Sequence, residues 1–157
     1  MENRSFEEYR LITESAQFLT ERRQHASQIY TSINVAVFSV ILFIAKDFKD
    51  EGWMTMASVF SICVMGILIC LAWRAIIRKY AHLIDFKYRQ LRAIEARQDM
   101  GWSHKICSRE WKEVYQTDWD NGKESFSNIE KQMPGVLIWL YGAGGLVVLF
   151  FLIAGFF

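Results

Sequence analysis

Three long apolar segments divide the chain into alternating apolar and polar parts. They cover residues 25–45, 52–73 and 134–157, and none contains Asp, Glu, Lys or Arg. A helix needs about 20 apolar residues to cross the roughly 30 Å of hydrocarbon in a bilayer. Each segment is long enough, so the pattern predicts three membrane-spanning helices, with a short loop at 46–51 and a longer polar segment at 74–133.

The polar residues next to these segments keep a helical period. In residues 1–24, Ser5 followed by Glu8 matches a helix-starting capping box, and apolar side chains recur every three or four positions: Phe6, Tyr9, Ile12, Ala16 and Leu19. Past the second apolar segment a similar stripe, broken by Lys87, contains Ile77, Tyr80, Ile84, Leu91 and Ile94. We therefore expect an amphipathic N-terminal helix that continues into the first span. We also expect the second span to continue unbroken into the polar segment, where its stripe packs against that helix or a neighbouring subunit.

The rest of the polar segment contains turn signals and two short helical patterns. After the turn "DMGWSHKICSR", the stretch "EWKEVYQTDW" predicts a short helix. A second short helix, "SFSNIEKQM", leads through Pro134, which is tolerated in the first turn of the third span. No linker or repeat separates a second domain, so residues 1–157 are predicted to form one integral membrane domain.

The distribution of positive charge predicts the orientation. Of the 18 Lys and Arg residues, sixteen lie in segments 1–24 and 74–133 and two lie in the loop 46–51. Lys and Arg are retained on the cytoplasmic side of a membrane. We therefore expect the N-terminus and the long polar segment in the cytoplasm, and Phe157 at the outer face. The net charge of +1 gives no reason to expect a nucleic-acid partner.

Few residues suggest chemistry. Cys63 and Cys70 lie seven positions apart in the second span and are expected in the core, while Cys107 would be a free thiol in a reducing cytoplasm. His104 and Cys107 have a ligand-like spacing, but no second pair completes a zinc site. Arg97 and His104 match the permissive R-x(4–6)-H motif of HEPN ribonucleases. Hydrolase, metalloprotease and nucleotide-binding motifs are absent from the sequence, so we predict no enzyme, no metal and no cofactor.

Two features of the spans leave alternatives open. Asn34, near Thr31 and Ser32, carries an amide that seeks a partner or water inside a membrane. It is predicted to line a pore or vestibule with these residues, to form an interhelical hydrogen bond, or to lie exposed at the membrane interface. The small residues of "YGAGG", which end at Gly145, favour close helix packing, within one chain or between subunits.

Four stretches carry a resemblance over nearly the whole chain: "ESAQFLTERRQHASQIYTSINVAV", "CLAWRAIIRKYAHLIDFKYRQLRAIEARQ", "REWKEVY" and "IEKQMPGVLIWLYG". In their order and residues they resemble the RipA family of small octameric bacterial membrane proteins and, more loosely, the SLATT effectors of bacterial conflict systems. The matching positions are chiefly Glu14, Arg22, Arg23, Asn34, Trp73, Tyr80, Leu83, Lys87, Glu95, Trp111, Glu130 and Pro134. The sequence departs from that pattern at "EARQDMGW", where the family has Leu-Pro after the glutamate.

The resemblance implies an all-α homo-oligomer of four to eight subunits, with an octamer favoured, in the bacterial inner membrane. It further implies a gated ion channel or pore that depolarises the membrane in antiphage defence. A cytoplasmic nucleotide or oligonucleotide signal, made by an enzyme encoded alongside, would control it. The alternative is a non-conducting scaffold or regulatory subunit that recruits a cytoplasmic partner.

Five basic residues near the predicted inner membrane surface are the candidate ligand-binding residues: Arg22, Arg23, Arg74, Arg78 and Lys79. Repeated around a ring, they would form a strongly positive collar. The collar would bind either an anionic signal or the head groups of membrane lipids. Both interpretations fit the sequence.

Overall fold

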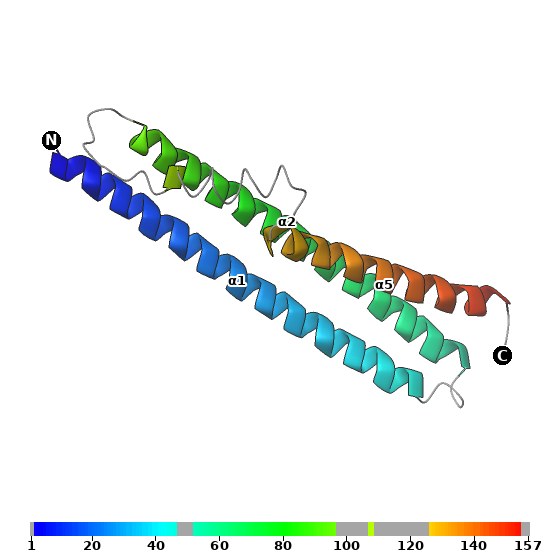
Figure 1. The fold of residues 1–157 in the computed structure, drawn as a ribbon. Coiled ribbons are helices and arrows are strands. Elements are labelled where there is room, and N and C mark those ends of the chain that lie inside the picture. Colours follow the sequence, from blue (N-terminus) through cyan, green and yellow to red (C-terminus); the bar gives the residue numbers. More distant parts are fainter. Residues whose placement is uncertain (1, 47–51, 97–106, 109–125, 155–157) are drawn as a thin grey trace. The chain divides into compact units, whose positions relative to one another are not determined.

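The computed structural model describes residues 2–46, 52–96, 107–108 and 126–154 (Figure 1). The long elements are the helices α1 (Glu2–Lys46), α2 (Gly52–Glu95) and α5 (Phe126–Ala154), and the described ranges contain no strand. Each helix contains a stretch long and apolar enough to cross a membrane. The prediction of an all-α chain with three spans is therefore confirmed.

The predicted continuity of the helices is also observed. α1 joins the polar N-terminal segment to the first apolar segment, and α2 joins the second apolar segment to the polar stripe that follows it, both without interruption (Figure 1). The capping-box prediction is wrong, because α1 begins at Glu2 and Ser5 lies inside the helix. Glu and Arg favour helix, and an acid near the positive N-terminal end of the helix dipole is stabilising, so the helix extends past the expected cap.

The third span differs from expectation at its beginning. α5 is one helix from Phe126, so the short helix "SFSNIEKQM" and the span are continuous, and Pro134 lies inside the helix rather than in its first turn. An interior proline cannot donate to the Glu130 carbonyl, and it costs about 3 kcal/mol. Pro134 is buried almost completely, and packing of its ring offsets part of that cost.

Two sets of sequence predictions lie outside the described residues. The short helix expected in "EWKEVYQTDW" lies within 109–125, and the pair Arg97 and His104 lies within 97–106. The turn expected in "DNGK" lies in the same ranges, as does the turn "DMGWSHKICSR" except for Cys107 and Ser108, which the structure describes as helical.

The chain divides into two compact units. The first unit comprises Met1–His25 and Ile77–Glu130, and the second comprises Ala26–Ile76 and Lys131–Phe157. In the first unit the polar part of α1 packs with the extension of α2, and the buried apolar residues come from the stripes read in the sequence: Ala16, Ile77, Leu91 and Ile94. The predicted helical bundle of these two segments is confirmed.

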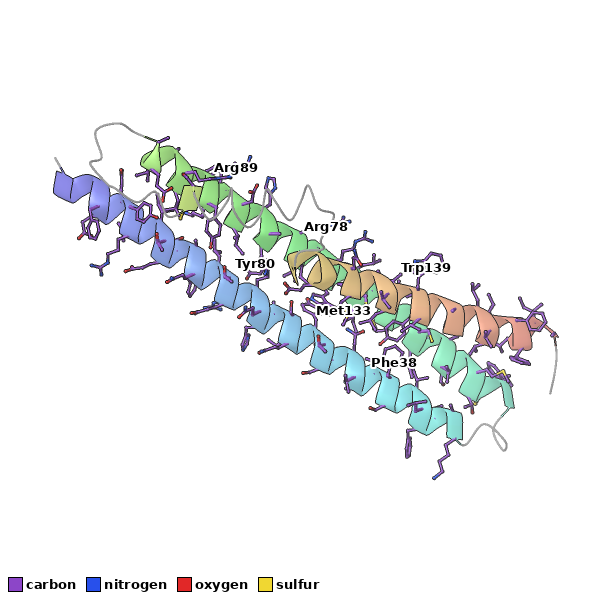
Figure 2. All side chains as sticks on the ribbon, in the orientation of Figure 1. Phe38, Arg78, Tyr80, Arg89, Met133 and Trp139 are labelled. Atoms are coloured by element: carbon purple, nitrogen blue, oxygen red, sulfur yellow. The ribbon has the colours of Figure 1, made fainter. Side chains whose placement is uncertain are left out.

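The second unit contains the apolar parts of all three helices. Its core comprises Val59, Cys63, Cys70 and Tyr141, with partly buried side chains from α1 and α5 around them. Cys63 and Cys70 are free thiols in this core, as the sequence predicted. Other apolar side chains face outward, and Trp139 on α5 is the most exposed of them at 80% (Figure 2). Such exposed apolar faces suit contact with lipid.

Candidate functional site

A buried amide connects the three helices of the second unit. Asn34 on α1 is only 2% exposed. Its Oδ1 accepts hydrogen bonds from the Tyr141 hydroxyl of α5 at 3.0 Å and from the Cys70 thiol of α2 at 3.3 Å. Its Nδ2 donates to the carbonyl of Tyr30 at 2.8 Å. One polar side chain thus bonds to both other helices, where hydrocarbon would offer it no partner.

Aromatic rings pack around this amide. The ring of Tyr141 stacks on the ring of Phe38 of α1, with the two ring centroids 4.6 Å apart (Figure 2). The same ring lies over Gly66 of α2, where an added Cβ would meet ring atoms at 2.6 Å. Nearby, Tyr30 stacks on the buried Trp73. Only glycine gives Tyr141 room to reach Asn34.

These contacts bear on the alternatives for Asn34. Within one chain the amide makes interhelical hydrogen bonds, and lining a pore would require it to leave these partners. Thr31 and Ser32 are exposed in the single chain, so they could line a pore without losing a partner in the core. Their pore-lining role stays a prediction. In "YGAGG", Gly144 and Gly145 pack against Cys63 of the same chain, whereas an added Cβ at Gly142 would meet nothing within 4 Å.

The exposed side of α1 is partly polar. Four polar side chains recur on it at steps of three, four or seven residues: Gln28, Thr31, Ser32 and Ser39. Thr31 donates to the carbonyl of Ser27 at 2.8 Å, and Ser39 donates to that of Val35 at 2.9 Å. Val35 and Leu42 add apolar side chains to this face. We call the four residues the polar belt. The pore-lining residues predicted from the sequence did not include Gln28 and Ser39, although both have a helical spacing from Thr31 and Ser32.

The five candidate basic residues fall into two groups. Arg23 is largely buried and pairs with Glu130 in the first unit, with Nη2 3.2 Å from Oε2. The other four are exposed and form no ion pair with a described residue: Arg22, Arg74, Arg78 and Lys79. The guanidinium of Arg22 lies 5.0 Å from the ring centre of Phe18. Arg23 is therefore bound to Glu130 within the first unit, and the exposed four are available to an anionic ligand.

The first unit contains a second buried polar cluster that the sequence reading missed. Glu95, at the end of α2, is 2% exposed. Its carboxylate accepts hydrogen bonds from the backbone N–H groups of Cys107 and Ser108, from the Ser108 hydroxyl at 2.7 Å and from the Tyr9 hydroxyl at 3.1 Å. Tyr9 Oη also lies 3.3 Å from Cys107 Sγ. A single carboxylate thus holds residues 107–108 and the beginning of α1.

The ionisation of this cluster follows from its contacts. Burial by itself raises the pKa of Glu95, but the hydrogen bonds from Ser108, Cys107 and Tyr9 outweigh it and leave the pKa below its ordinary value. Burial and the neighbouring thiol and carboxylate raise the pKa of Tyr9. The cluster therefore contains an ionised carboxylate and a neutral phenol. Among the described residues no group of three His, Cys, Asp or Glu side chains could hold a metal ion.

Comparison with known proteins gives one match. A model of the octameric membrane protein family matches residues 6–153, which covers all three helices almost completely. Neither the curated proteins nor the solved structures give a significant match.

Proposed function

Because the chain belongs to the octameric membrane protein family, we propose that its copies surround a water-filled path and form a gated ion channel in the bacterial inner membrane. The three spans of one chain are too few to enclose such a path, so several copies are needed. The polar belt of α1 lines the path, and the apolar face of α5 that carries Trp139 faces lipid.

The polar belt is the observation that carries the proposal. It lies in an apolar segment without charged residues, yet it exposes an amide and three hydroxyls on the side of α1 away from the core. A hydroxyl can bond to the helix carbonyl four residues earlier, as Thr31 and Ser39 do. The side-chain amide of Gln28 has more hydrogen-bond donors and acceptors than a bond to one helix carbonyl can satisfy. Leaving the others without partners in hydrocarbon is costly. Water in a central path satisfies them.

The proposed gate responds to a cytoplasmic signal. The excess of Lys and Arg in these segments supports a cytoplasmic location for the N-terminus and the extension of α2. There the exposed residues Arg22, Arg74, Arg78 and Lys79 bind the phosphate groups of a nucleotide or oligonucleotide made by an enzyme encoded alongside. Opening depolarises the membrane of a phage-infected cell. Membrane lipids are the competing ligand for the same four residues.

One observation favours the alternative of a non-conducting scaffold. Leu83 and Phe86, on the part of α2 beyond the apolar segment, are 42% and 50% exposed. Exposed apolar residues on a polar helix mark a contact surface for a neighbouring copy or a recruited partner. A scaffold has no water path, so its polar belt would be closed to water. Neither reading assigns the chain a catalytic activity.

Accessibility of the polar belt to water separates the two functions. Ser32→Cys, in a Cys107→Ser background, is treated in membranes with a membrane-impermeant charged thiosulfonate. We expect rapid modification of Ser32→Cys and none of the matched control Trp139→Cys, whose side chain faces lipid. Protection of both cysteines, together with silence in planar-bilayer recordings, would show that the belt is an interface between copies and that the chain does not conduct.

A further inference from the structure

The face of α1 that carries the polar belt continues beyond the membrane-spanning segment. Moving toward the N-terminus from Gln28, steps of three or four residues reach His25, Gln24, Glu21 and Gln17, all of which are exposed. Residues spaced in this way lie on one side of a helix. Since α1 is uninterrupted from Glu2 to Lys46, Glu21 lies on the same face as Gln28 and Ser32.

Glu21 is the first charged residue on that face. The segment 25–45 contains no Asp, Glu, Lys or Arg, so a path along the belt meets none of these residues until it reaches Glu21. Among the described residues Glu21 forms no ion pair. The next acid on this face, Glu14, is already bound by Arg10, with the Nε and Oε1 atoms 2.9 Å apart.

The neighbouring arginines point elsewhere. Successive residues of a helix are rotated by roughly 100°. Arg22 therefore leaves the face and lies over the ring of Phe18, and Arg23 points to the opposite side, where it pairs with Glu130. The two arginines of "ERR" therefore add no positive charge to this face. The charged residue on it that forms no ion pair with a described residue is Glu21.

We propose that Glu21, repeated once in every copy, forms a ring of carboxylates at the cytoplasmic mouth of the path and makes it prefer cations. The proposal rests on the proposed channel and adds its substrate class. Rings of acidic side chains raise the local concentration of cations and exclude anions, as in other cation channels. The expected preference is opposite to the one that the excess of basic residues in the polar segments would suggest.

The test is the reversal potential of single channels in asymmetric KCl. The full chain is reconstituted in a planar bilayer, and openings are recorded with and without an extract of phage-infected cells. We expect the parent to prefer K⁺ over Cl⁻, Glu21→Gln to lose most of that preference, and Glu21→Lys to reverse it. The matched control is Glu8→Gln, which removes an exposed acid from another face of α1 and leaves the preference unchanged.

Two results overturn the proposal in different ways. A parent channel without cation preference, or one that keeps its preference in Glu21→Gln, shows that Glu21 is not at the mouth, while conduction itself stands. Membranes that stay silent under both conditions overturn the proposed channel, and the ring of carboxylates with it.

Discussion

At the scale of single residues, the contact between Tyr141 and Gly66 shows how little space the core of the second unit leaves. The ring of Tyr141 occupies the place where a side chain at Gly66 would begin, and this position allows its hydroxyl to reach Asn34. A methyl group at this position has to displace the ring of Tyr141. That displacement breaks the hydrogen bond to Asn34 and the stack on Phe38.

Gly66→Ala is therefore expected to destabilise the protein. Overpacking of this kind costs about 1–3 kcal/mol, which thermal unfolding of the protein in nanodiscs would show as a lower Tm. Gly142→Ala is the matched control, because its added Cβ meets nothing within 4 Å. Equal Tm values for the two variants would mean that Tyr141 does not lie against Gly66.

Variants of the buried amide separate its structural role from a pore-lining one. Tyr141→Phe removes one hydrogen bond to Asn34 and should cost about 0.6 kcal/mol, the average for such bonds within membranes. Asn34→Leu should cost more, because it leaves the Tyr141 hydroxyl buried without its acceptor. Both costs are measured as changes in unfolding free energy. An Asn34→Leu protein that unfolds like the parent but no longer conducts would instead place Asn34 in the path.

Glu95 gives the first unit a defined dependence on pH. Its pKa is lower in the folded protein than its ordinary value of 4.5. The ionised carboxylate therefore contributes stability above that ordinary pKa, and the contribution is lost as the pH falls through the folded-state pKa. We expect Glu95→Gln to lower stability at neutral pH and to reduce the loss on acidification, as measured by chemical unfolding at a series of pH values. Glu8→Gln, an exposed acid on α1, serves as the control; equal pH profiles for Glu95→Gln and the parent would contradict the assignment.

At the scale of elements, one ion pair joins two helices of the first unit. Arg23 on α1 and Glu130 on α5 have side chains only 16% and 21% exposed. Removing one partner leaves the other charge partly buried and without its counter-charge. Arg23→Gln and Glu130→Gln should therefore each lower the free energy of unfolding more than a substitution that breaks the exposed ion pair of Arg10 and Glu14.

A double-mutant cycle measures this coupling. Arg23→Gln combined with Glu130→Gln should lose less stability than the sum of the single variants, with a coupling on the order of 1 kcal/mol. The same cycle at Arg10 and Glu14 is expected to give a coupling close to zero. Additive costs at Arg23 and Glu130 would show that the two side chains do not interact.

The two faces of α1 are the main observation at this scale. One side carries Asn34 and packs in the core, and the exposed side carries the polar belt and Glu21. A helix that met only its own chain and lipid would show apolar residues on the outer face. On α1, polar residues stand among exposed apolar ones such as Val35 and Leu42. This mixture supports the proposed contact of α1 with other copies and with water.

At the scale of the whole molecule, the proposed function predicts a cell-level result. Expression of the chain with its neighbouring genes should depolarise the membrane after phage infection, measured with a potential-sensitive dye. Ser32→Leu, which replaces a hydroxyl of the belt by an apolar side chain, should suppress the depolarisation without changing the mass of the assembly in nanodiscs. The exposed serine of α2, Ser61, provides the control variant Ser61→Leu. If the Ser32→Leu protein still depolarises the membrane after infection, Ser32 does not line the path.

The sequence was sufficient for the elements. Segments without charge and long enough for a bilayer define the spans, and a period of three or four carries α1 and α2 past them, because both signals depend on local composition and helix geometry. The same reasoning proposed Thr31 and Ser32 as pore-lining residues, which the structure leaves exposed, and the order of motifs led to the family. It misjudged the beginnings of α1 and α5, since helix ends depend on weak local preferences that packing overrides.

What only the tertiary structure decided is which polar residues are partners. Asn34 is bonded to Cys70 and Tyr141, Arg23 to Glu130, and Glu95 to Tyr9 and Ser108, and all of these pairs are distant in sequence or on different helices. A polar residue in the sequence can seek water, lipid head groups or a side chain elsewhere in the chain, and its burial decides among them. Local composition determined where the helices run. The packing of their faces determined which polar groups form bonds inside the chain and which, such as Ser32 and Glu21, stay exposed.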